Sequence, residues 1–188
     1  MLKNQKAFTL IELLVTLSIL GVVMAFAIPS FKSSVANNRS AGAGGELSTA
    51  INIARAEAIK RGAYVTICAS NTGNSCLAAG NWAKGWLIFA DDATSDTAAP
   101  VVTVAPVDKV IRYWKDLPAA SIVTAKKATA GTDIDYLRFT GTGILARAAN
   151  DAEARVFNVS MTDCKGQQKS RVTVGLAGMI GLSKVSCP

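Results

Sequence analysis

The residue types that most often carry enzyme chemistry are sparse in this sequence. Its 188 residues include no histidine, so the commonest general base is absent. A serine nucleophile would therefore need a different activator, and no residues at a suitable spacing supply one. The sequence argues against an enzyme, and we assign no catalytic residue and no cofactor.

Three aspartates, Asp91, Asp92 and Asp96, are the carboxylates that could form a calcium loop. Their spacing lacks the alternating oxygen ligands and the distal glutamate of an EF-hand, so a solvated turn is the better interpretation. Trp82 and Trp86 could form a binding surface, but aromatic residues beside a strand more often lie in the core. We therefore expect neither group to bind a ligand.

The four cysteines offer a third kind of chemistry. Without histidine or C-x-x-C spacing they do not form a metal-binding or redox motif, so no metal site is expected. They can pair in three ways. The simplest joins Cys68 to Cys76 and Cys164 to Cys187, because each pair then brackets a turn-rich stretch. Such bridges form in the periplasm or outside the cell, and each typically adds about 2 to 4 kcal/mol of stability.

A single carboxylate inside an apolar segment is the remaining candidate. From Phe8 to Ile28 only Glu12 is charged, and as a helix this segment would span about 30 Å, the thickness of a bilayer core. Lys3, Lys6 and the small-x-small site at 25–27, Ala-Phe-Ala, would also suit a secretory signal peptide. That alternative fits less well, because the apolar stretch is long and signal peptides rarely contain a carboxylate. A plain signal anchor leaves Glu12 unexplained, since a carboxylate in the hydrocarbon region costs about 2.5 to 3.5 kcal/mol.

A helix is expected to continue from this segment, with a kink tolerated at Pro29. The run from Ser40 to Gly45 has low helix propensity, which predicts a bend or a locally melted turn. Beyond it, Glu57 can reach Arg61 at i,i+4, and Gly62 is a suitable end for the helix. Apolar residues recur at helical spacing at Leu47, Ile51, Ala54 and Ala58. Residues 29–62 are therefore predicted to form an amphipathic continuation of the helix.

The rest of the chain is predicted to be rich in strands. Short β-prone runs separated by turn residues occur at 64–68, 85–89, 110–114, 121–124, 136–139, 154–160 and 171–174. One helix followed by successive strands indicates an α+β fold, in which a long N-terminal helix packs on an antiparallel β-sheet domain. The length suits one globular domain and one anchor.

The start of the sequence resembles the prepilin signature of type IV pilins and type II secretion pseudopilins. Met1 to Ala7 corresponds to the short basic leader, Phe8 to the first mature residue and Glu12 to the family's glutamate. The resemblance implies that prepilin peptidase cleaves between Ala7 and Phe8 and that the new amine of Phe8 is methylated. It also implies that Glu12 pairs with that amine on a neighbouring subunit. Pro29 stands where many pilins have proline, whereas Ala7 replaces the usual glycine.

The remainder resembles the soluble domain of the GspH/FimT family, which includes FimU-like minor pilins. The resemblance is carried by 54–68, 82–89 and 139–143. It implies a pilin-like fold divided into four parts, which are a leader at 1–7, a transmembrane and polymerisation helix at 8–28, its continuation at 29–62 and a periplasmic domain at 63–188. Such a chain would cross the inner membrane once and later enter a fibre.

The same resemblance implies a minor pilin of a type IV pilus that primes or caps fibre assembly, in adhesion and twitching motility. Its partners would be other minor pilins, the major pilin, prepilin peptidase and, before assembly, inner-membrane lipid. One alternative is a GspH-like pseudopilin of a type II secretion system. This structural role, in either system, is preferred to the DNA-binding role considered next.

A second alternative is a FimT-like protein that binds DNA in natural transformation. The net charge of +7, or +5 without Lys3 and Lys6, permits such contact without proving it. In FimT-like proteins an arginine-rich stretch near the C-terminus contacts DNA, but residues 178–184 here offer one cation. A patch could still form if the Cys164–Cys187 bridge brought the tail beside other cations, namely Lys165, Lys169, Arg171 and Lys184.

Overall fold

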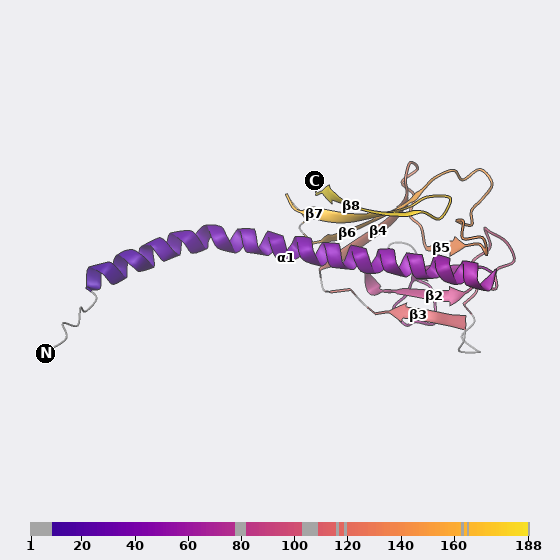
Figure 1. Cartoon of the computed structure of the whole chain (residues 1–188), viewed down its shortest axis with the longest axis horizontal. Coiled ribbons are helices and arrows are strands. Elements are labelled where there is room, and N and C mark those ends of the chain that lie inside the picture. The colour runs from indigo at the N-terminus through magenta and orange to yellow at the C-terminus, as the bar shows by residue number, and fades with distance from the viewer. Residues whose placement is uncertain are drawn as a thin grey trace. The chain divides into compact units, whose positions relative to one another are not determined.

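The computed structural model describes residues 9–77, 82–102, 109–115, 117–118, 120–162, 164 and 166–187. The predicted cleavage and methylation sites at Ala7 and Phe8, and the predicted DNA contact Lys165, lie outside these residues. The chain divides into two compact units, residues 1–36 and residues 37–188. The second unit contains all the strands described below (Figure 1).

Helix α1, Leu10–Arg61, is continuous over 52 residues and includes Pro29. It ends as predicted at Gly62, whose φ of 62° lets the chain turn out of the helix without a Cβ clash. The predicted pair also forms, with Arg61 Nε 2.9 Å from the Glu57 carboxylate.

The predicted bend or melted turn at residues 40–45 is wrong, because α1 is helical throughout this run. Ser40, Ala43 and Gly44 are buried there against the sheet. Glycine and serine weaken an isolated helix, but here the small side chains let α1 approach the strands closely. Tertiary packing therefore outweighs intrinsic propensity.

Two antiparallel sheets make up the β-rich domain, which confirms the predicted α+β fold but replaces one sheet with two. Their strand orders are β3-β2-β1-β5 and β4-β6-β7-β8. The bounds are β1 Val65–Ala69, β2 Trp86–Ala90, β3 Val110–Trp114, β4 Ser121–Lys127, β5 Tyr136–Phe139, β6 Arg155–Met161, β7 Gln168–Val174 and β8 Ile180–Ser186, with a 3-10 helix η1 at Trp82–Lys84. The first seven strands match the predicted runs. Strand β8 was not predicted, because this edge strand has no buried residue and so no apolar alternation.

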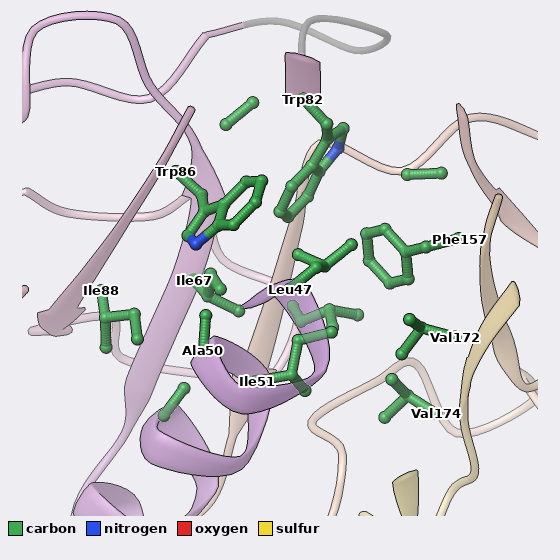
Figure 2. Packing of buried hydrophobic residues seen from close by; sticks show 14 of the residues in the cluster. Leu47, Ala50, Ile51, Ile67, Trp82, Trp86, Ile88, Phe157, Val172 and Val174 are labelled. Carbon is green, nitrogen blue, oxygen red and sulfur yellow. The ribbon is translucent and has the colours of Figure 1, made fainter. Parts of the chain in front are cut away.

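The second half of α1 supplies one side of a core that both sheets share. Figure 2 shows Leu47 and Ile51 of the helix among residues from β1, β6 and β7. Trp82 and Trp86 are fully buried, which confirms that they belong to the core. The Trp82 ring meets Phe157 edge-on at 5.0 Å between centroids, and its indole N–H donates to the carbonyl oxygen of Ile134 at 3.0 Å.

Candidate subunit-assembly site

The first turn of α1 is closed by a reciprocal pair of side-chain hydrogen bonds. The backbone N–H and hydroxyl of Thr9 donate to Glu12 Oε2 at 3.0 and 2.8 Å, and the Glu12 N–H donates to the Thr9 hydroxyl at 3.3 Å. This arrangement is a capping box, which satisfies two of the N–H groups that every helix start leaves without a partner. Glu12 therefore has a local role in the single chain, separate from any contact with a neighbouring subunit.

The apolar residues that follow Glu12 are uncovered. From Leu10 to Ile28, every large apolar residue keeps 50 to 77% of its surface exposed. Within the described residues, α1 is the one helix whose length and hydropathy would allow it to cross a membrane. Because exposed apolar area of this size is unfavourable in water, this segment requires lipid or another apolar helix around it.

Polar contacts fix α1 to the second sheet beyond this segment. The Ser40 hydroxyl donates to the carbonyl oxygen of Val159 at 2.6 Å and accepts from the N–H of Ser170 at 3.0 Å. Val159 and Ser170 face each other across β6 and β7, so one hydroxyl satisfies backbone groups of both strands. Asn37 accepts a further hydrogen bond from the N–H of Gln168 at 2.8 Å. The helix is thus docked by specific bonds as well as by apolar packing.

Two disulfides are present in the structure, Cys68–Cys76 and Cys164–Cys187. The first links β1 to the turn-rich stretch that follows it. The second joins the end of β8 to the segment before β7, where the Cys187 N–H also donates to the carbonyl oxygen of Gln167 at 2.9 Å. Both bridges constrain loops of the globular domain.

The prediction of a solvated turn is wrong for Asp91, whose side chain is fully buried. Its carboxylate pairs with the equally buried Arg138 guanidinium at 2.7 Å and accepts from the Thr66 hydroxyl at 2.6 Å. The other carboxylate oxygen accepts from the N–H groups of Ala93 and Val101, both at 3.0 Å. These bonds use the carboxylate as an internal anchor for the loop between β2 and β3.

Arg138, the buried ion-pair partner of Asp91, was not predicted from the sequence. Besides Asp91, it donates to the carbonyl oxygens of Ser95, Asp96 and Ala98 at 2.9 to 3.2 Å. The only sequence signal was an arginine between two apolar residues of a buried strand, where a cation requires a carboxylate.

The other two aspartates of the predicted turn are also engaged. Asp92 forms an ion pair with Lys109. Asp96 accepts from the Tyr64 hydroxyl at 2.6 Å, and this hydrogen bond raises the pKa of Tyr64. All three aspartates therefore organise the loop.

A second buried ionic group, also missed from the sequence, lies at the start of β6. Asp151 accepts from Arg155 and Lys127 at 2.7 and 2.8 Å. Burial alone would raise the pKa of Asp151, but the hydrogen bonds from these two cations outweigh it and hold the pKa well below its usual range. The group borders a polar cavity of about 300 Å³ that is lined by both carboxylates and cations. The charges of Asp151, Arg155 and Lys127 are paired with one another.

The predicted DNA-contacting cations do not all share one surface. Alternate residues of β7 are buried, beginning with Ser170, so Lys169 and Arg171 project from the opposite face. Lys184 stands opposite Ser170 in the β7–β8 register and so shares the face of Ser170. Arg171 Nε donates to the side chain of Asn158 at 3.1 Å.

Two family models and two solved crystal structures match this chain. The family model of the type II transport protein GspH matches residues 43–178, and that of the prokaryotic N-terminal methylation motif matches residues 2–28. A crystal structure of the type IV minor pilin FimU from Pseudomonas aeruginosa is similar, with a TM-score of 0.52 and 25% identity over 78% of this chain and 89% of that one. A second crystal form of FimU gives a TM-score of 0.48 and 24% identity over 76% and 90%. No curated protein matches the chain.

These matches extend over nearly all of the described chain. The GspH model covers the second half of α1 and most of the strands, and the methylation motif covers the apolar segment. The motif and the apolar helix together indicate a single-pass inner-membrane protein with a C-terminal globular domain. This protein belongs to the GspH family of pilin-like structural subunits and carries the N-terminal methylation motif.

Proposed function

We propose that this chain is a minor pilin, which is cleaved by prepilin peptidase before Phe8 and enters a type IV pilus with other minor pilins to prime or cap it. The observation that carries the proposal is the uncovered apolar segment from Leu10 to Ile28, which lies within a methylation motif and leads into a GspH-type domain. Lipid would cover this segment before assembly, and the helices of other minor pilins and of the major pilin would cover it in the fibre. The similarity to FimU, a type IV minor pilin, supports the pilus as the setting.

Glu12 has the central role in this proposal. In a fibre its carboxylate would form an ion pair with the methylated amine of Phe8 on a neighbouring subunit. This pairing would offset the cost of placing a charge among apolar helices. The capping box suggests a competing explanation, in which Glu12 only stabilises the first turn of α1. A test must separate the two roles.

Glutamine at position 12 separates them, because it can complete a capping box but carries no charge. We expect both Glu12→Gln and Glu12→Ala to be cleaved normally and to be depleted from sheared fibres. Thr9→Ala is the matched control, since it removes the cap and keeps the carboxylate, and we expect it to enter fibres. If Glu12→Gln enters fibres like the wild type while Thr9→Ala does not, the capping role is sufficient and the pairing role is wrong.

A GspH-like pseudopilin of a type II secretion system is the second candidate, because the matching family model bears that description. Deleting the gene distinguishes the two settings. Loss of surface pili with normal protein secretion supports the minor pilin, whereas loss of secretion with normal pili supports the pseudopilin. The DNA-binding alternative is not preferred, since Lys184 lies on a different face from Lys169 and Arg171.

A further inference from the structure

Three exposed apolar residues lie on segments that meet at one end of the globular domain, outside the apolar segment of α1. Ile59, in the last turn of α1, is 51% exposed, Ile144, in the turn after β5, is 48% exposed, and Met179, in the β7–β8 turn, is 72% exposed. The Leu145 N–H donates to the carbonyl oxygen of Leu176 at 3.0 Å, which joins the two turns. We call Ile59, Ile144 and Met179 the apolar patch.

Arg55 holds the segments that present the apolar patch. Its Nε donates to the carbonyl oxygen of Gly143 at 2.9 Å, and its Nη2 donates to that of Ala177 at 3.3 Å. Gly143 and Gly178 have φ values of 77° and 76°, a conformation that favours glycine. A Cβ on Gly178 would collide with the Gly143 carbonyl oxygen and Arg55, and one on Gly143 would collide with Ile59. The helix and both turns are therefore in direct contact.

This arrangement makes the apolar patch a preorganised surface. The turns are fixed by the Arg55 guanidinium, so a partner that binds Ile144 and Met179 does not have to order them first. Clustered exposed apolar side chains on a folded domain are typical of interaction sites.

The charges beside the apolar patch indicate the chemistry of the partner. The last two turns of α1 contain three cations, Arg55, Lys60 and Arg61, and one carboxylate, Glu57. Glu57 accepts from Lys60 at 3.3 Å and from Arg61 at 2.9 Å, so its charge is already engaged. A second copy of the chain would place this excess of cations against itself, which is unfavourable. A surface with an apolar centre and carboxylates around it is complementary.

We propose that the apolar patch is the docking surface for a different pilin-like subunit, one that presents apolar side chains bordered by carboxylates. This inference rests on the proposed function, because it requires a complex of several subunits. The proposed contact lies at the end of the globular domain where Arg55 meets the turns that contain Gly143 and Gly178. It is separate from any contact that subunits make through the apolar segment of α1.

Photo-crosslinking of the full chain in its host tests the location and the occupant. A benzoylphenylalanine residue replaces Met179 in one variant and Ile122 in the control, since Ile122 is also exposed, at 43%, but lies on β4. We expect position 179 to yield an adduct with a different pilin-like subunit, identified by mass spectrometry, at about ten times the level at position 122. Equal adducts at the two positions, or an adduct between two copies of this chain, would overturn the proposal.

A charge substitution then tests whether the contact matters for assembly. Met179→Asp should reduce the chain in sheared fibres about tenfold, whereas Ile122→Asp should leave it unchanged. Near-UV circular dichroism of both purified variants checks that the tryptophan core is intact. If wild type enters fibres and Met179→Asp enters equally, the docking inference fails while the proposed function stands. If wild type is absent from fibres, the proposed function fails, and the crosslinks alone decide the docking surface.

Discussion

Removing the buried carboxylate of Asp91 should destabilise the globular domain more than any surface substitution. In Asp91→Ala, the Arg138 guanidinium stays fully buried without its counter-charge, and the N–H groups of Ala93 and Val101 lose their acceptor. Breaking a buried ion pair on one side typically costs about 3 to 5 kcal/mol. For a chain of this size each kcal/mol lowers the melting temperature by about 2 to 4 °C, which predicts a fall of about 6 to 20 °C.

The assay is thermal unfolding of the full, oxidised chain in detergent, followed by near-UV circular dichroism. This signal reports the packing of Trp82 and Trp86 in the globular domain. The apolar segment of α1 contributes little to it, because residues 10–28 contain no tryptophan or tyrosine. The double variant Asp91→Ala/Arg138→Met removes both charges, and we expect it to be more stable than Asp91→Ala alone. A fall of less than about 2 °C for Asp91→Ala would refute the assignment of this pair as the anchor of the β2–β3 loop.

Three further predictions concern separate parts of the globular domain. Gly44→Ala should destabilise the domain by about 1 to 3 kcal/mol in denaturant unfolding, because the added methyl group meets β7. Gly45→Ala, where the methyl group has open space, should be neutral or slightly stabilising. Equal effects of the two changes would contradict the close helix–sheet contact. The folded-state pKa of Asp151 is depressed, so its stabilisation is present above the unfolded pKa of about 3.9 and is lost as pH falls below that value toward the folded-state pKa. Asp151→Asn should therefore lose less stability than wild type between pH 5 and 3. An equal loss of stability in the two proteins over this range would count against this role. Cys187→Ser should cost about 2 to 4 kcal/mol and match Cys164→Ser/Cys187→Ser, and an unchanged melting temperature under oxidising conditions would argue against the bridge.

Local patterns predicted the elements of this fold well, because each depended on neighbouring residues. The apolar run after Phe8, the glycine after the helix and the β-prone runs all carry their signal within a few positions. The resemblance to pilins likewise came from short strings around Glu12 and Trp82. Burial of both tryptophans followed from their place beside a strand.

Long-range contacts explain what the sequence did not predict. The run from Ser40 to Gly45 is a poor helix former, and it is helical where it packs on β6 and β7, over a hundred residues away in the sequence. Asp91 and Arg138 are 47 residues apart in the sequence, so the residues around each one gave no sign that the other would neutralise its charge. Division of the strands into two sheets depends on similar distant pairings.

The mature N-terminus of the chain recovered from sheared fibres is the most direct test of the central claim. Mass spectrometry should find a first peptide that begins with N-methylated Phe8 and retains Glu12. A chain in the fibre fraction that begins just after Ala27 would identify the apolar segment as a secretory signal peptide. That result, or recovery of only uncleaved chain in the membrane, would contradict the account of this protein as a processed and assembled pilin subunit.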